Sequence, residues 1–486
     1  MSNSSLIILA LTVPIVGALL IAMSDRKPNQ RDGITLLTAG ILFAAVVALL
    51  PSILAGKRPG LSLIEVVPGI KIAFEVEPLG MMFAAIASFL WIVNSIYSFG
   101  YMRGNKEAHQ TRFYVCFAAS LWAVIGIAFS ANLFTLFVFY EILTILTYPL
   151  VTHHGDRNAV QGGRVYLGIL LTTSIALLLP AIVLTAFVAG TLDFQVGGIL
   201  AGKVSPVLGG LLLFMFIYGT GKAALMPMHK WLPAAMVAPT PVSALLHAVA
   251  VVKAGVFVVV KVVIYIFGID YLSNLANTEW LLYISGATIV IASIIALRSD
   301  NLKRRLAYST ISQLSYVIMA TAILLPISAV GAALHIVVHA FGKITLFFAA
   351  GSIYTAAHKT KVSQLDGIGR RMPWTMGAFA IGALSMIGVP PTAGFVSKWF
   401  ILQGAMQAES VFAFVVIVIS TLLNAAYFLP IVYAAFFRKA PAETKHGEAP
   451  LPIVIALAAT AGGTIALFFF PDMALQLARD VVRSGG

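Results

Sequence analysis

Long apolar runs dominate this sequence, and they limit the folds that the chain can adopt. A helix needs about 20 predominantly apolar residues to cross a bilayer, where every backbone polar group must be satisfied within the protein. Hydrophobic residues make up 60% of the 486 positions and charged residues only 10%, whereas about 25% of a typical soluble domain is charged. The sequence therefore predicts an all-α polytopic membrane protein with about 14 spans, at 5–23, 34–55, 78–100, 113–130, 132–151, 164–189, 205–227, 240–268, 279–297, 306–327, 329–356, 375–403, 410–437 and 451–475.

The basic residues alternate between the connecting loops. Most loop Lys and Arg residues follow odd-numbered spans, and only a few follow even-numbered spans or lie in the C-terminal tail. The positive-inside rule then predicts that the odd loops are cytoplasmic and that both termini lie on the outer face of the cell (inner or plasma) membrane. The net charge of +13 is explained by this topology rather than by nucleic-acid binding. The first span lacks a preceding basic stretch and a small-residue cleavage site, so we expect a retained helix rather than a signal peptide.

Two spans are interrupted by glycine and proline. The seventh runs into 219–233 and the twelfth into 388–398, and each interruption carries a lysine, Lys222 or Lys398. Interrupted segments in corresponding halves of a transporter indicate inverted repeats around a site near the bilayer midplane. No long linker divides the chain, so we expect one membrane domain, 1–486. It comprises helices 1–3 (1–111), a first inverted repeat of helices 4–8 (112–268), a second of helices 9–13 (279–437) and helix 14 (451–475).

Glu141 is the one carboxylate that the sequence places deep inside an apolar span. An acid at that depth costs roughly 2.5–3.5 kcal/mol on insertion scales, so it requires protonation or a buried partner. Two interpretations stay open for Glu141, a structural ion pair and a proton-binding group that responds to a nearby lysine. For Lys222 and Lys398, the alternative to a buried role is snorkelling to the interface.

The eighth span carries one histidine and two lysines. Lys253 lies near its middle, where snorkelling is difficult. Lys261 is eight residues further on and near the same helical face, but it lies within two turns of Gly268, so we expect it to snorkel. His247 is off the face of Lys253 by roughly 120°. A buried structural histidine and a proton-relay group are both open for it.

His335, His339 and Lys343 have the sharpest spacing in the chain. Positions i, i+4 and i+8 line one helical face at intervals of about 6 Å. Two histidines at i and i+4 also fit zinc ligation, but no acidic residue accompanies them and the lysine repels a cation. Proton transfer fits better, because histidine titrates near neutral pH. The sequence also places His153, His154 and His229 in inner loops, as solvated residues or, alternatively, as groups for proton entry or exit.

The chain contains one cysteine, Cys116. A single thiol excludes an internal disulfide and a cysteine-ligated iron–sulfur cluster within this chain. We expect neither a cofactor nor a metal, and no catalytic residue in the enzymatic sense. Electron transfer, if the assembled complex carries it out, would belong to another protein of that complex.

Four stretches resemble the antiporter-like membrane subunits of respiratory complex I, membrane-bound hydrogenases and Mrp-type cation/proton antiporters. These stretches are 136–144, 226–247, 300–313 and 335–398, and with the spans they cover nearly the whole chain. The resemblance implies that Glu141 and Lys222 form the ion pair of a first half-channel and that Lys253 bridges to a central axis. It assigns that axis to His335, His339 and Lys343, and the end of a second half-channel to Lys398.

The resemblance implies a proton-translocating subunit that works with other membrane subunits in a hetero-oligomeric complex, moving protons and, as a further candidate ion, Na⁺. A D-type subunit of a Mrp antiporter is favoured, because Lys398 replaces the glutamate of one complex I subunit type and few residues follow the last span. A pumping subunit of an NADH-quinone oxidoreductase or hydrogenase is the alternative, followed by an independent secondary transporter. A structural scaffold would not explain five lysines inside spans.

Overall fold

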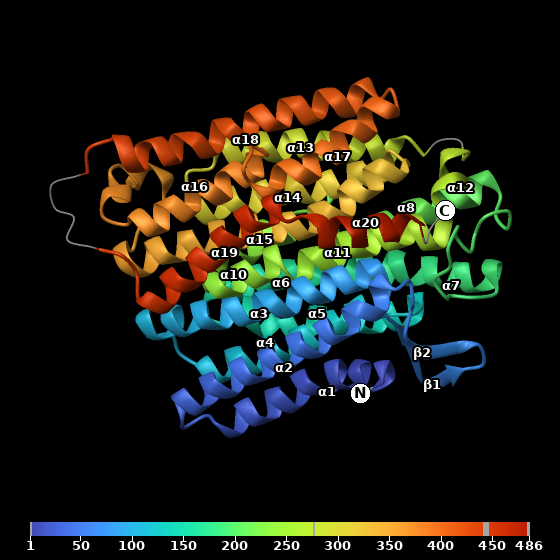
Figure 1. Cartoon of the computed structure of the whole chain (residues 1–486), viewed down its shortest axis with the longest axis horizontal. Coiled ribbons are helices and arrows are strands. Elements are labelled where there is room, and N and C mark those ends of the chain that lie inside the picture. Colours follow the sequence, from blue (N-terminus) through green and yellow to red (C-terminus); the bar gives the residue numbers. More distant parts are fainter. Residues whose placement is uncertain (1, 276–277, 441–446, 484–486) are drawn as a thin grey trace.

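The computed structural model describes residues 2–275, 278–440 and 447–483, and the side chains of residues 246 and 247 lie outside this description. Long helices lie side by side with their axes roughly aligned, from α1 at one edge to α18 at the other (Figure 1). We call the end that carries the β-hairpin the hairpin face and the opposite end the loop face. Residues 441–446, in the connection between the spans expected at 410–437 and 451–475, lie outside the described residues.

The N-terminal part contains three helices and one hairpin. They are α1 (Asn3–Met23), α2 (Pro28–Leu54), β1 (Gly60–Val67), β2 (Ile70–Glu75) and α3 (Pro78–Gly104). The antiparallel hairpin is an addition to the predicted all-α fold. It docks on the chain before α5, where the side-chain amide of Asn132 donates to the Lys71 carbonyl oxygen at 2.9 Å.

The segment expected to form the first repeat contains more breaks than the sequence predicted. Its helices are α4 (Gln110–Ala128), α5 (Leu133–Val151), α6 (Arg157–Thr173), α7 (Leu179–Ala189), α8 (Pro206–Gly219), α9 (Trp231–Ala234), α10 (Thr240–Ala248), α11 (Val251–Lys261) and α12 (Ile269–Ser273). Short 3₁₀ turns occupy Gly221–Ala223 and Ala235–Val237, and π-helical turns occupy Ser174–Leu178 and Val262–Phe267. The seventh span is interrupted as expected, whereas the break between α10 and α11 in the eighth span was not predicted.

The remaining helices are α13 (Trp280–Arg298), α14 (Leu302–Ala322), α15 (Pro326–Ala357), α16 (Pro373–Ile387), α17 (Ala393–Gln407), α18 (Val411–Phe437), α19 (Leu451–Phe469) and α20 (Asp472–Arg483), with 3₁₀ turns at Val362–Gln364 and Ile368–Arg370. The break between α16 and α17 is the one expected in the twelfth span. Among the described residues, ten helices are long and apolar enough to cross a membrane, and α8 and α16 are shorter apolar helices.

Several helices begin at a residue whose side chain accepts a backbone N–H of the first turn. Asn132 does so for α5, Asp156 for α6 and Asn301 for α14. This capping satisfies donors that have no partner within the helix. Helix α15 is the centre of the molecule, because its whole apolar stretch is buried by its neighbours. His335, His339 and Lys343 of α15 are therefore enclosed by protein rather than lipid.

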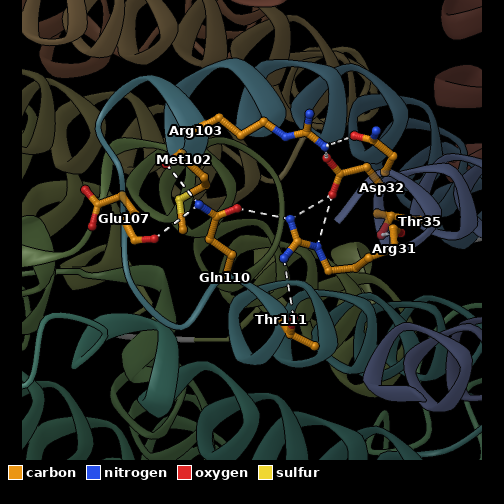
Figure 2. A network of polar contacts seen from close by, with 9 residues as sticks. Arg31, Asp32, Thr35, Met102, Arg103, Glu107, Gln110 and Thr111 are labelled. Atoms are coloured by element: carbon orange, nitrogen blue, oxygen red, sulfur yellow. Dashed lines mark hydrogen bonds and ion pairs between the residues drawn. The ribbon is translucent and has the colours of Figure 1, made fainter. Parts of the chain in front are cut away.

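At the loop face, α2 begins earlier than predicted. Because the helix starts at Pro28, Arg31 and Asp32 lie within it and are buried rather than in a solvated loop. Figure 2 shows the Arg31 guanidinium between Asp32, Gln110 and Thr111, while Arg103 reaches the same carboxylate from α3. This network joins α2, α3 and α4, so these charges stabilise helix packing at the loop face.

Candidate functional site

The break after α8 buries Lys222 in the protein interior. The side chain is 0% exposed, so it does not snorkel to the interface. Its ammonium donates to the Tyr140 carbonyl oxygen at 2.8 Å and to the Thr144 hydroxyl at 2.6 Å. It also lies 3.1 Å from the centroid of the Tyr140 ring. Neutral oxygens and an aromatic face therefore hold this cation.

Glu141 lies on α5 between the two residues that hold Lys222. It is partly buried, and its Oε1 has no hydrogen-bond partner among the described residues. The ion pair with Lys222 that the resemblance implies is not formed in this structure, because the ammonium is bound to Tyr140 and Thr144 instead. The acid and the lysine are neighbours that interact through space without a direct contact.

Close packing at a glycine positions the Lys222 segment. A Cβ atom at Gly255 of α11 would lie 2.2 Å from the Ala223 backbone nitrogen and 2.3 Å from the Lys222 carbonyl carbon. Only a residue without a side chain allows this approach. Helix α11 therefore fixes the position of the backbone that carries Lys222.

Lys253, in the first turn of α11, connects the two halves of the chain. Its side chain is 1% exposed, and its Nζ lies 2.7 Å from Nδ1 of His339 on α15. The break between α10 and α11 places this lysine at the start of a helix in mid-span. The sequence-predicted bridging lysine and the central row are thus in direct contact.

His335, His339 and Lys343 lie along one face of α15, and each is at most 1% exposed. The two imidazole rings are 5.9 Å apart, and Nδ1 of His335 lies 2.9 Å from the hydroxyl of Ser397. Throughout the described part of the chain, no three His, Cys, Asp or Glu side chains gather as a metal site requires. Each of the three residues instead hydrogen bonds a side chain from another helix, which is Ser397, Lys253 or Ser309.

A hydrogen-bonded chain leads from Lys343 toward the second break. The Lys343 ammonium donates to the Ser309 hydroxyl at 2.8 Å, and the Tyr427 hydroxyl lies 3.0 Å from the same oxygen. Tyr427 also hydrogen bonds Asn424, whose amide nitrogen is 3.4 Å from the Met386 carbonyl oxygen. The chain ends at the carbonyl group that also binds Lys398.

The break between α16 and α17 binds the Lys398 side chain, which is 6% exposed. Its ammonium donates to the carbonyl oxygens of Met386 at 2.8 Å and Ile387 at 3.1 Å. These are carbonyls of the last turn of α16, where the helix dipole favours a cation. Lys222 and Lys398 therefore occupy similar places, each buried at an interrupted helix and bound by backbone carbonyl oxygen.

Comparison with known proteins identifies the relatives of this chain. A family model described as "NADH:quinone oxidoreductase/Mrp antiporter, TM" matches residues 130–424. Subunit N of the NADH-quinone oxidoreductase of Desulforudis audaxviator is 30% identical over 452 residues, covering 92% of this chain and 89% of that relative. The chain belongs to the NADH:quinone oxidoreductase/Mrp antiporter membrane family. A probable K⁺/H⁺ antiporter protein of Rhizobium meliloti is also 30% identical, over 77% of this chain and 38% of the relative.

Two solved structures share the fold of this chain. A chain of the Mrp complex from Dietzia sp. DQ12-45-1b superimposes with a TM-score of 0.88 at 20% identity, covering 99% of this chain and 97% of that one. A chain of the membrane-bound sulfane sulfur reductase, an archaeal respiratory membrane complex, gives 0.88 at 22% identity, covering 99% and 98%. The antiporter-like membrane fold predicted from the sequence is confirmed.

The sequence analysis did not identify the uncharged side chains that hydrogen bond the buried lysines and histidines. Ser309, Ser397 and Tyr427 each contact a lysine or histidine of the row or lie on its hydrogen-bonded chain. Gln313, one turn after Ser309 on α14, is 0% exposed, and neither atom of its amide has a partner in the described part of the protein. Buried amides of this kind are usually satisfied by internal water. Polar residues recurring at helical spacing in an apolar span were the available signal.

The prediction that Lys261 snorkels is wrong. The side chain is 1% exposed, its ammonium donates to the Ser130 carbonyl oxygen at 2.8 Å, and Glu77 lies 3.4 Å away. The loop before α5 and the start of α3 cover this end of α11, which the sequence pattern did not reveal. Glu77 is 3% exposed and so is more deeply buried than Glu141, the acid that the sequence singled out. The side chain of His247 lies outside the described residues.

His154, one of the three inner-loop histidines, borders a cavity at the loop face. The cavity, of about 250 Å³, is lined in part by Glu107, His154, Thr240 and Lys303. Nε2 of His154 lies 3.3 Å from Glu107, and this hydrogen bond raises the pKa of the histidine. Burial lowers the pKa of the neighbouring His153 to about 4. The expectation of solvated loop histidines is wrong for His153, which is 3% exposed.

Proposed function

We propose that this chain is the proton-translocating subunit of a multisubunit membrane complex, and that the complex is a Mrp-type monovalent cation/proton antiporter in which this chain is the D-type subunit. The observation that carries the proposal is the buried row of lysines and histidines. It begins at Lys222, crosses between the halves at the 2.7 Å contact of Lys253 with His339, and ends at Lys398. A structural scaffold does not require such a row.

In the proposed mechanism, each lysine stores one proton on Nζ and its protonation biases the next group. Glu141 has a carboxylate oxygen free of hydrogen bonds among the described residues, so it can attract Lys222 when ionised and release it when protonated. Unit charges about 8 Å apart at an effective dielectric near 20 interact by about 2 kcal/mol. That energy corresponds to a shift of more than one pKa unit in the neighbouring group. Protonation of one group can therefore drive a proton off the next.

The row also suggests the organisation of the chain. Two inverted repeats, 112–268 and 279–437, would place Lys222 and Lys398 in equivalent positions, and both lysines are held by carbonyl oxygen near an interrupted helix. With the loop face in the cytoplasm and both termini outside, the cavity beside Glu107 and His154 would admit protons from the cytoplasm. The orientation of the chain in the membrane and the two inverted repeats therefore belong to the proposed function.

The proposed function is tested in the purified complex reconstituted in vesicles, with a pH-sensitive dye. We expect Glu141→Gln, Lys222→Ala and Lys398→Ala each to abolish proton transport while the complex remains assembled. Lys203→Ala is the matched control, because Lys203 is exposed in the loop before α8. Proton transport at the control rate in an assembled Lys398→Ala complex would contradict the proposal.

A redox-driven pump is the second candidate. It is favoured by the NADH-quinone oxidoreductase relative, which this chain matches over most of both lengths. The same vesicles separate the two functions. Proton movement driven by a Na⁺ gradient without an electron donor supports the antiporter, and movement that requires an electron donor and a quinone supports the pump.

A further inference from the structure

A second buried cluster of titratable groups lies near the hairpin face, outside the row described above. Glu77 is 3% exposed and accepts a hydrogen bond from the Tyr265 hydroxyl at 2.7 Å through one carboxylate oxygen. Its other oxygen lies 3.4 Å from the ammonium of Lys261. The same lysine donates to the Ser130 carbonyl oxygen at 2.8 Å. An acid, a base and a phenol thus meet in the protein interior.

Segments far apart in the sequence build this cluster. Glu77 precedes α3 and accepts backbone N–H groups of its first turn, whereas Lys261 ends α11 and Tyr265 lies in the π-helical turn after it. Phe194, from the loop after α7, places its ring 4.1 Å from the Lys261 ammonium. A site that depends on so many segments is specified by the tertiary structure.

The β-hairpin brings a partly exposed carboxylate, that of Glu75, close to the cluster in sequence. Strand β2 ends at Glu75, two residues before Glu77. The side chain of Glu75 is 38% exposed, whereas that of Glu77 is 4% exposed. Burial raises the pKa of Glu75, and the charges of Arg58 and Lys261 oppose that shift, while Glu77 and Asp193 reinforce it. A cavity of about 230 Å³, lined partly by Arg58, opens beside the first residue of α3.

Lys261 of the cluster lies on α11, the helix that carries Lys253. Eight residues separate Lys253 from Lys261, which corresponds to about 12 Å along nearly the same helical face. Phe257 lies midway between them, with its ring centroid 5.4 Å from the Lys261 ammonium. It packs against Phe83 of α3 at 5.1 Å. An aromatic pair therefore separates the central row from the cluster.

We propose that Glu77, Lys261 and Tyr265 form a second proton-transfer site, through which the proton of Lys253 exchanges with the hairpin face. The inference rests on the proposed function and adds a route by which protons leave at the hairpin face. The Lys261 ammonium passes a proton from Nζ to the Glu77 carboxylate, and Glu77 releases it to water beside Glu75. Water that enters when the aromatic pair separates then carries the proton of Lys253 to neutral Lys261, and Lys253 becomes neutral.

The alternative role is a structural ion pair that fastens α11 to the start of α3. Arginine separates the two roles, because it keeps the positive charge and can keep the ion pair but does not release its proton at physiological pH. A structural pair tolerates Lys261→Arg, whereas a proton-transfer site does not. The matched control is Lys203→Arg, an exposed lysine near the same face that donates to the Ala189 carbonyl oxygen at 2.9 Å.

The experiment measures proton transport by the complete reconstituted complex. We expect Lys261→Arg to reduce the rate at least tenfold in an assembled complex, and Lys203→Arg to leave it unchanged. Transport by Lys261→Arg at the control rate would overturn the inference. The proposed function has its own test, because Lys398→Ala abolishes transport if that function is correct, whatever the result at Lys261.

A second variant decides the question if Lys261→Arg does not assemble. Glu77→Gln keeps the shape of the side chain and an oxygen for the Tyr265 hydroxyl, but it cannot accept the proton from Lys261. We expect a loss of at least tenfold in transport with assembly retained. Transport by assembled Glu77→Gln at the control rate would show that this cluster is not on the proton path.

Discussion

Four buried lysines of the proposed proton path are held by neutral partners. Lys222, Lys343 and Lys398 donate to carbonyl or hydroxyl oxygens, and Lys253 contacts the imidazole of His339. A buried ammonium that is paired with a carboxylate leaves an unpaired charge when its proton goes to solvent, unless the carboxylate itself takes that proton. An ammonium that is held by neutral groups loses its proton without leaving such a charge. This chemistry suits proton transfer better than structural stabilisation.

Tyr427 is the residue at which the hydrogen-bonded chain to Lys398 is most easily cut. Its hydroxyl bridges Ser309 and Asn424, and Phe at this position keeps the ring but removes the bridge. We expect Tyr427→Phe to lower proton transport about tenfold in the assembled complex, measured in vesicles. Tyr433→Phe on the same helix is the control, because Tyr433 is 57% exposed. Equal rates in the two variants would show that protons bypass Tyr427.

Broken helices are the elements that make the site. The break after α16 leaves terminal carbonyls free to bind Lys398, and the break after α8 turns Lys222 toward the Tyr140 carbonyl of α5. At the second break, Gly394 of α17 allows a similarly close approach, since a Cβ there would lie 1.8 Å from the Ser385 carbonyl oxygen. Each break is therefore held in place by a glycine on a neighbouring helix segment.

Gly255 packs against the first break so closely that a side chain there should displace the Lys222 segment. Gly255→Ala adds a methyl group against the backbone of Lys222 and Ala223, and overpacking of this kind costs about 1–3 kcal/mol. We expect the Lys222 segment to shift and transport to fall at least tenfold, together with a lower thermal stability in detergent. Gly210→Ala on α8 is the control, because a Cβ there meets nothing within 4 Å. Unchanged transport in Gly255→Ala would show that the segment tolerates displacement.

For the whole molecule, the Glu141 end of the row lies near a lateral surface. Glu141 is partly exposed, and Ile145, one turn later on α5, is 59% exposed. A carboxylate that faces lipid is unfavourable by about 2.5–3.5 kcal/mol, so a neighbouring protein of the complex is expected to cover this surface. The relatives with known assemblies are themselves subunits of larger complexes.

The isolated chain therefore provides a test at the scale of the molecule. We expect the chain alone, reconstituted in vesicles, to show no ion-gradient-driven proton transport, whereas the complete complex does. The measurement is dye-reported pH change, with protein-free vesicles as the control for leakage. Transport by the chain alone would favour the independent secondary transporter considered from the sequence.

The sequence alone determined the class of fold and most of the residues in the row. Apolar runs, loop charge, the two glycine- and proline-rich interruptions and the spacing of His335, His339 and Lys343 are local patterns, and each has a direct physical meaning in a bilayer. These patterns do not report distances between helices. They led to the wrong prediction that Lys261 snorkels, and they did not identify Tyr140 and Thr144 as the partners of Lys222.

The tertiary structure decided which buried groups meet. It brought Lys253 to His339, placed Tyr427 between Lys343 and the second break, and paired Lys261 with Glu77 across almost two hundred positions of the chain. It also separated Glu141 from Lys222 by giving the ammonium neutral oxygens. Burial can be predicted from composition, but a contact depends on how helices distant in sequence pack. Only the folded chain specifies that packing.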